Sequence, residues 1–562
     1  MISSFEWGKN FVFKRFSLAN LRANWYLPIS ALVFFVMQVG GRSRTSIAEI
    51  FIAFFAWILL CSCVIPSDIW KSSADSGIGI KIFSGLTALG ICIFSHTFLY
   101  ERMVKHREAF DKVLELMHMP EHIFYCVSFI LSLCMLVFVY LITNYFWHKF
   151  LKLIKSSGLF QDISRAEIVF YALIFTVSVI SVTAVFTRTY AFYGGDNYNI
   201  IYSSDSSYLV DGNCFLNLCH PENDIRQPLF ALFSFPFIGL PYLIGRIAAL
   251  FLGHRELMTV LFMNYTQIAM LIAGIFTLAK AMRLSSLYRA FFTACFACSY
   301  IYLLSVLVME QYIIAFFWLS TCIYFVCKDS QPDRMILYGA TGTLTTSVAF
   351  TPFYLGGGGG YLRTLCSAGF EFVALILAFS KAGVIYTFFS RLRSLFRFTG
   401  IGGTYVSFID RLKQYSEFVY YSFFSPNAGL HTGKFLSWQL CQPENINYIG
   451  LVIFIVAILG AIINHNKKIC QISFMWLVYS FLILCVIGWG TAENGLILYS
   501  LYFSWAFYIL IFMLIVKAEE LSGVKFLVPA LILAAVCVLA RGSLPAILEL
   551  VDFCTKYYPY SW

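Results

Sequence analysis

Long apolar runs, separated by short polar stretches, recur along almost the whole chain. A transmembrane helix needs about 17–25 mainly apolar residues, and many windows reach that length. The strands of a membrane β-barrel would instead alternate between apolar and polar positions, and these runs do not alternate. The pattern predicts an all-α fold, a polytopic transmembrane helical bundle of about 13–15 spans with a large extracytoplasmic loop after the fifth span.

The expected spans follow from hydropathy and length. They cover residues 24–41, 47–65, 82–99, 122–146, 167–187, 257–282, 290–309, 310–327, 334–355, 364–382, 448–464, 469–488, 494–516 and 523–541, with a weaker one at 405–424. Residues 227–252 are also apolar, but Pro228, Pro236 and Pro241 interrupt them, and proline kinks a helix. We therefore expect this segment to be re-entrant or to lie on the surface, without a net crossing.

The basic residues cluster in alternate loops. Lys9, Lys14, Arg15 and Arg22 precede the first span and favour a cytoplasmic N-terminus, because cytoplasmic loops retain lysine and arginine. Counting forward places further basic clusters on the same side, at 149–165, 280–289, 391–397, 467–468 and 517–525. Residues 101–120 would lie outside although they are partly basic, and their interleaved acidic residues indicate an amphipathic surface helix.

Composition supports the membrane assignment. The 562 residues are 60% hydrophobic and 12% charged, with a mean hydropathy of +0.78, which excludes an ordinary soluble domain. The net charge of +10 is explained by the cytoplasmic loops and does not indicate nucleic-acid binding.

We expect no cleavable signal peptide, because the first residues lack an apolar core that ends in a small-residue cleavage site. Most cysteines lie in apolar runs; Cys214 and Cys219 share a polar loop, either as a disulfide or as two thiols.

That polar loop, Tyr190–Arg226, is the main acidic region of the chain. It contains Asp196, Asp205, Asp211, Glu222 and Asp224, together with His220 and Arg226. On the span count it lies outside, as do the turn at 309–311, the glycine run 356–360, residues 427–448 and residues 491–494. Polar features from distant parts of the chain thus gather at one face, as a single external site would require.

Three acidic residues are candidates for catalysis. Asp196 or Asp205, held at the membrane surface, can act as a general base toward a hydroxyl group; the alternative is a turn aspartate that caps a short helix. Glu310 lies between two spans with almost no loop, and an ionisable residue at the hydrocarbon edge is a functional candidate by default. The alternative for Glu310 is an N-cap of the second span.

The remaining candidates would bind substrate. Arg226 and Arg363 can pair with a phosphate, because a guanidinium group forms two parallel hydrogen bonds with it. The other candidates are Asp211, His220, Glu222, Asp224 and Glu493. The loop has enough carboxylates for a divalent cation, but it lacks a diagnostic spacing, so no metal ligand is assigned.

Several short motifs resemble those of the GT-C superfamily of polytopic membrane glycosyltransferases. They are GGDNY or SSDSSY for an aspartate soon after the membrane, RQPLFALF for a proline-containing segment, MEQYIIAFF for a later external hinge, and WGTAENGLILYSLYF near a late span. The resemblance covers residues 167–330 and extends more loosely to the C-terminus. It implies accessory helices in 1–166, a core in 167–330 with a catalytic extracytoplasmic loop at 188–256, and C-terminal membrane helices in 331–562.

The resemblance implies an inverting sugar transfer from a polyprenyl-phosphate donor to a hydroxyl of a cell-envelope glycan, lipid or protein. Asp196 or Asp205 would deprotonate the acceptor, and Arg226 or Arg363 would neutralise the departing lipid phosphate. Some members of this superfamily use a divalent cation and others do not. The expected location is a bacterial cytoplasmic (inner) membrane.

The alternative is a membrane transporter or a lipid or glycan flippase. Transporters tend to place ionisable residues near the bilayer midplane and to contain inverted repeats. Glu371 is the main charge within a predicted span, and no repeat is evident. The enzyme is therefore the favoured interpretation.

Overall fold

The computed structural model describes most of the chain. The described residues are 24–39, 47–63, 69–116, 118–194, 200–218, 220, 226–328, 333–350, 361–379, 393–394, 396–397, 399–402, 406–433, 435–491, 496–524 and 526–560. Within them the fold is all-α, a polytopic helical bundle with one two-stranded sheet. The chain forms two compact units. Unit 1 comprises Met1–Ser157, Asn213–Phe262 and Leu355–Phe388, and unit 2 comprises Gly158–Gly212, Met263–Tyr354 and Phe389–Trp562.

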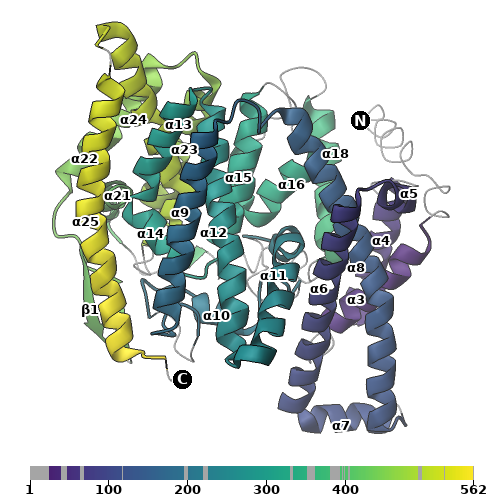
Figure 1. The fold of residues 1–562 in the computed structure, drawn as a ribbon. Helices are drawn as coiled ribbons and strands as arrows, with labels where there is room; N and C mark the ends of the chain where they lie inside the picture. The colour runs from purple at the N-terminus through teal and green to yellow at the C-terminus, as the bar shows by residue number, and fades with distance from the viewer. Residues whose placement is uncertain are drawn as a thin grey trace. The chain divides into compact units, whose positions relative to one another are not determined.

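Unit 1 is built around a close helix pair. Its helices are α3 (Tyr26–Val39), α4 (Ile47–Cys63), α5 (Ile69–Ala74), α6 (Ile78–Lys105), α7 (Arg107–Leu116), α8 (Glu121–Ser157), α11 (Phe230–Leu252) and α18 (Tyr361–Phe379). A Cβ atom built on Gly90 of α6 would lie 2.0 Å from the carbonyl oxygen of Gly239 in α11. Only glycine fits there, and small residues at such contacts let membrane helices pack backbone to backbone. Helix α7 lies across the ends of α6 and α8 with its charged residues mostly exposed, as expected of an amphipathic surface helix (Figure 1).

Helix α11 corrects the expectation for residues 227–252. It is a continuous helix of 23 residues that contains Pro236 and Pro241, and it is long and apolar enough to cross a membrane. The prediction that the prolines would break the segment was wrong. A buried face packed against α6 holds the helix together, since neighbouring helices compensate for the hydrogen bonds that proline removes. The side chain of Trp147 in α8 donates to the Pro236 carbonyl at 3.2 Å.

Unit 2 contains the remaining elements. They are α9 (Arg165–Phe186), α10 (Ser206–Asp211), most of α12 (Arg255–Ala281), α13 (Ser286–Ala297), α14 (Tyr300–Leu307), α15 (Tyr312–Cys327), α16 (Arg334–Thr343), η1 (Thr345–Phe350), α21 (Phe408–Tyr421), β1 (Ala428–Thr432), β2 (Leu436–Leu440), α22 (Tyr448–Ile463), α23 (Lys468–Ser480), η2 (Phe481–Ile487), η3 (Leu496–Tyr499), α24 (Ser500–Ser522) and α25 (Leu527–Tyr557). The two strands pair antiparallel, with Ala428 opposite Leu440 and Thr432 opposite Leu436. Buried aromatic and aliphatic side chains of α15 and α24 form much of the core of unit 2.

Among the described residues, eight helical segments are long and apolar enough to cross a membrane. A ninth is possible if α13 and α14, bent by 69° at their junction, count as one span. Four further apolar helices are shorter, including α15 and α22. The protein is therefore an integral, multi-pass membrane protein. Within the described residues, several expected spans are short or bent; residues 334–350, for example, contain the 10-residue α16 followed by η1.

Candidate functional site

Basic side chains lie together at one end of unit 2. Lys280 at the end of α12 donates to the carbonyl of Gln161 at 2.5 Å, and Arg283 donates to that of Cys327 at 2.6 Å. Arg289 forms two hydrogen bonds of 2.8 and 2.7 Å with the carboxylate of Glu167, and both side chains are buried. These contacts join the first turns of α9 and α13 to the last turns of α12 and α15. They define what we call the basic end of unit 2.

The opposite end of unit 2 holds the start of the acidic loop. The hydroxyl of Thr189, just after α9, donates to the carbonyl of Tyr558 at 2.6 Å, beyond α25. Residues 200–202 pair with the hairpin: Trp438 donates its N–H to the Ile200 carbonyl at 2.7 Å, and Tyr202 donates to the Trp438 carbonyl at 2.8 Å. The loop is thus anchored to two elements from the C-terminal part of the chain. We call this the acidic end of unit 2.

Asp205 and Glu310 meet at the acidic end. The backbone N–H of Asp205 donates to Glu310 Oε1 at 3.0 Å, between residues 105 positions apart in sequence. Before Asp205 the chain turns sharply, because Tyr202 and Ser203 both adopt positive φ angles, of 49° and 59°. Non-glycine residues rarely adopt this conformation, which costs free energy and tends to occur at functional sites. The turn and the hydrogen bond together fix the position of Asp205.

The carboxylate of Asp205 is exposed and does not cap a helix. Asp205 occupies the N-cap position of α10, but its side chain makes no capping hydrogen bond. The alternative interpretation of a helix-capping aspartate is therefore not supported. Similarly, Glu310 is not the N-cap of α15, because that position belongs to Gln311.

Glu310 is buried, with 5% of its surface exposed, in a polar layer where the α14–α15 junction meets the middle of α12. Gln267 of α12 donates its side-chain N–H to the Glu310 carbonyl at 3.0 Å. One turn earlier, Asn264 donates to the Val306 carbonyl at 3.3 Å. These two amides hold the α14–α15 junction, and hence the backbone of Glu310, against α12.

The same layer has more hydrogen-bond acceptors than donors. The side-chain oxygens of Asn264, Gln267 and Gln311 are buried and have no hydrogen-bond partner among the described residues. A buried polar atom without a partner costs about 1–3 kcal/mol, so native proteins rarely leave several together. Such a layer suits a ligand that brings hydroxyl groups.

A cleft with an empty volume of about 350 Å³ opens beside Glu310. Its lining residues are Ile301, Leu304, Ser305, Val308, Glu310, Tyr312, Ile313, Ile497, Leu498, Ser500 and Leu501. The walls are mostly apolar, and Glu310 is the only carboxylic acid in the described part of the lining. A carboxylate and two serine hydroxyls in an apolar cleft can orient a small hydroxylated group.

Two buried tyrosines join the acidic loop to α14. The hydroxyl oxygens of Tyr202 and Tyr300 lie 2.5 Å apart, and both residues are almost fully buried. Burial raises the pKa of Tyr202, so this pair is neutral at physiological pH. The pair therefore fixes the loop that carries Asp205 and is not a source of charge.

Sequence analysis did not identify these supporting residues. Asn264 and Gln267 gave a usable signal, because two amides spaced three residues apart within an apolar run are unusual. Tyr202, Tyr300 and Trp438 gave none, since aromatic residues make up 19% of the chain.

The other predicted site residues are distributed as follows. Asp211 is exposed at the end of α10, in unit 2. His220 is buried and Arg226 is half-buried, both in unit 1. Arg363 lies in α18 of unit 1, and its side chain is outside the described structure. Asp196, Glu222, Asp224 and Glu493, as well as Cys219, are outside the described residues.

The described residues contain no group of three histidine, cysteine, aspartate or glutamate side chains that could hold a metal ion. A divalent cation thus remains a prediction from the resemblance, and no ligand is assigned to it. Comparison of the chain with protein-family models, with curated proteins and with solved structures found no match in any of the three.

Proposed function

We propose that this protein is a membrane glycosyltransferase that moves a sugar from a polyprenyl-phosphate donor to a hydroxyl group of a glycan, lipid or protein acceptor. The observation that carries the proposal is the hydrogen bond between the Asp205 backbone and Glu310. It joins two of the acidic residues named by the GT-C resemblance and lies beside a cleft. Asp196, the other candidate base, is outside the described residues, so the proposal uses Asp205.

The charge distribution of unit 2 supports an extracytoplasmic site. Lys280, Arg283 and Arg289 lie at the basic end, and cytoplasmic surfaces of membrane proteins are enriched in lysine and arginine. Asp205 and Glu310 lie at the opposite end of the same unit. If the basic end is cytoplasmic, the acidic end faces the outside, where polyprenyl-linked sugars are consumed in the superfamily that the chain resembles.

In the proposed reaction, the exposed Asp205 carboxylate accepts the proton of the acceptor hydroxyl. The acceptor oxygen then forms a bond with the anomeric carbon of the donor, and the bond from that carbon to the phosphate oxygen breaks. The polyprenyl phosphate leaves with the electron pair, and the configuration at the anomeric carbon inverts.

Glu310 has a different role in this scheme. Its carboxylate accepts the Asp205 N–H and so positions the base. It also lines the cleft, where its carboxyl oxygens can accept hydrogen bonds from hydroxyl groups. The cleft would therefore receive a sugar. Arg226 and Arg363 remain the predicted partners of the phosphate.

The test is a transfer assay with the purified protein, a set of polyprenyl-phosphate sugars and acceptors of the three classes. The expected result is a new glycosidic product with inverted configuration. The transporter alternative predicts the opposite combination: no product with any donor, together with flux of the lipid-linked sugar across the bilayer of proteoliposomes. That combination would refute the enzyme.

A further inference from the structure

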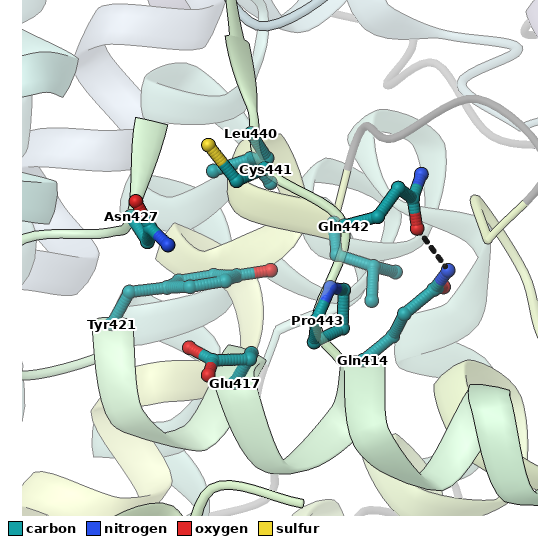
Figure 2. Close-up of a pocket in the computed structure, with 9 residues that line it drawn as sticks. Gln414, Glu417, Tyr421, Asn427, Leu440, Cys441, Gln442 and Pro443 are labelled. Atoms are coloured by element: carbon teal, nitrogen blue, oxygen red, sulfur yellow. Dashed lines mark hydrogen bonds between the residues drawn. The ribbon is translucent and has the colours of Figure 1, made fainter. Parts of the chain in front are cut away.

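A second cleft opens at the acidic end of unit 2, between α21 and the segment that follows β2. Its empty volume, counted out to open solvent, is about 470 Å³. The lining residues are Gln414, Glu417, Tyr421, Asn427, Leu440, Cys441, Gln442, Pro443 and Leu496. Figure 2 shows eight of them labelled, with α21 along one side and residues 440–443 along the other. We call it the amide cleft.

Helical periodicity places three of these side chains on the same face. Gln414, Glu417 and Tyr421 are spaced three and four residues apart in α21, so they line one face of the helix. This face of α21 is polar, and it presents an amide, a carboxylate and a phenol to the cleft. Such a set offers both hydrogen-bond donors and acceptors.

The polar groups are held in place by contacts around the cleft. Gln414 donates its side-chain N–H to Gln442 Oε1 at 3.3 Å, which links the two walls (Figure 2). Asn447, the N-cap of α22, donates to Glu417 Oε1 at 3.1 Å. The N–H of Cys441 donates to the Asn427 carbonyl at 2.9 Å and fixes the upper rim. Preorganised groups of this kind bind a ligand at a lower entropic cost.

The chemistry of the lining selects a class of ligand. Three side-chain amides, one carboxylate and one phenol line the cleft, and the described lining contains no lysine, arginine or histidine. The Tyr421 hydroxyl is a hydrogen-bond donor and acceptor. Amides and carboxylates bind hydroxyl groups well, whereas Glu417 would repel an anion. Tyr421 also supplies an apolar ring face.

The amide cleft adjoins the cleft beside Glu310. Leu496 lines the amide cleft, and the next residue, Ile497, lines the other. Both belong to the short helix η3, which therefore separates the two clefts.

We propose that the amide cleft binds a neutral, hydroxyl-rich glycan. Its role as the acceptor subsite rests on the proposed glycosyltransferase function, whereas glycan binding itself does not. An acceptor whose distal sugars lie between Gln414 and Gln442 would extend its terminal hydroxyl past η3 toward Glu310. The preferred acceptor would then be an oligosaccharide, and not a lipid or protein hydroxyl without attached sugar.

Cys441 gives a direct test of binding, because it is exposed and lines the cleft. The rate of its alkylation by N-ethylmaleimide would be followed by mass spectrometry of the purified protein, with and without neutral disaccharides such as maltose, cellobiose and chitobiose. We expect at least one to slow alkylation of Cys441 several-fold in the millimolar range. Cys537, which is also exposed but lies in α25, serves as the internal control and should react at an unchanged rate.

Variants and a charged probe sharpen the test. Gln442→Ala and Glu417→Gln should each abolish the protection, whereas Asp410→Asn, on the same helix but outside the cleft, should retain it. Glucose 6-phosphate should protect at least ten times less well than a neutral sugar. If no neutral sugar protects Cys441, or if Gln442→Ala and Glu417→Gln both leave protection intact, the amide cleft is not a glycan site.

The outcomes also separate this inference from the proposed function. If the protein transfers sugar and Gln442→Ala leaves the KM for an oligosaccharide acceptor unchanged, the acceptor subsite is wrong while the enzyme stands. If neutral sugars protect Cys441 but no transfer occurs, the glycan site stands and the enzyme is wrong. An increase in acceptor KM of tenfold or more in Gln442→Ala, with kcat retained, supports both.

Discussion

The backbone N–H of Asp205 donates a 3.0 Å hydrogen bond to the carboxylate of Glu310, which joins the residue that precedes the short helix α10 to the junction of α14 and α15. Because Glu310 is buried and Asp205 is exposed, one acid positions the other. The two residues are therefore expected to respond differently to substitution.

Glu310→Ala removes the hydrogen-bond acceptor, so the loop before α10 should lose its fixed position. We expect a fall in transfer activity of about 10²-fold, the loss that a shift of about 1 Å in a catalytic group can cause. Glu310→Gln keeps an oxygen acceptor and should retain the fold, with a change in stability of about 1 kcal/mol or less. Activity and thermal unfolding in detergent would be measured side by side. Equal activity of Glu310→Ala and wild type would exclude a positioning role.

Tyr202 and Tyr300 should behave as a coupled pair. Tyr202→Phe removes the partner of the buried Tyr300 hydroxyl, at a cost of about 1–3 kcal/mol, whereas Tyr300→Phe leaves Tyr202 its hydrogen bond with Trp438 and should cost less. The double change should cost less than the sum. A double-mutant cycle on the free energy of unfolding would measure the coupling, which we expect to be about 1 kcal/mol. Tyr302→Phe, which removes a contact with Ser178 instead, should not couple to Tyr202. Strict additivity of the Tyr202 and Tyr300 changes would contradict the contact.

Glu167 and Arg289 form a buried ion pair at the basic end. Removing one partner strands a charge in a region of low polarity, so Arg289→Met should destabilise the protein by about 3–5 kcal/mol. The combined change Glu167→Leu with Arg289→Met should recover most of that loss. Lys517→Met, in the exposed pair with Glu520, is the control and should cost less than about 1 kcal/mol. A loss no larger for Arg289→Met than for Lys517→Met would refute the importance of the buried pair.

The two ends of unit 2 should lie on opposite sides of the membrane. Glu444→Cys marks the acidic end and Glu520→Cys marks the basic end, and both native side chains are exposed. A membrane-impermeant maleimide added to intact cells should label the first and label the second only after lysis, with mass spectrometry to identify the modified position. The reverse pattern would place Asp205 in the cytoplasm and remove the extracytoplasmic site.

The sequence predicted the class of fold because long apolar runs are strong local signals. It also named Asp205 and Glu310 as candidates, since acidic residues are conspicuous next to apolar helices. It failed at α11, where the prolines suggested a break, because the close packing of Gly90 on Gly239 that supports the helix is a tertiary contact. It also could not show that Asp205 meets Glu310, since this pairing depends on how α9 and α14 pack.

Hydropathy alone also did not predict which apolar segments form long helices. Hydropathy does not distinguish a spanning helix from a short buried one, and α15 is only 16 residues long although it is apolar throughout. The amide cleft was invisible in the sequence, because its walls come from α21 and from residues 440–443, whose amides have no distinctive spacing.

The most direct test of the account is the activity of Asp205→Asn. Asparagine has nearly the same shape but cannot accept the acceptor's proton, and its backbone N–H can still reach Glu310. With a polyprenyl-phosphate sugar that wild type turns over, we predict that kcat falls about 10²–10⁴-fold while thermal stability is unchanged. Asp552→Asn, an exposed aspartate of α25, should keep wild-type activity. Full activity of purified Asp205→Asn would show that Asp205 is not the base and would contradict the central claim.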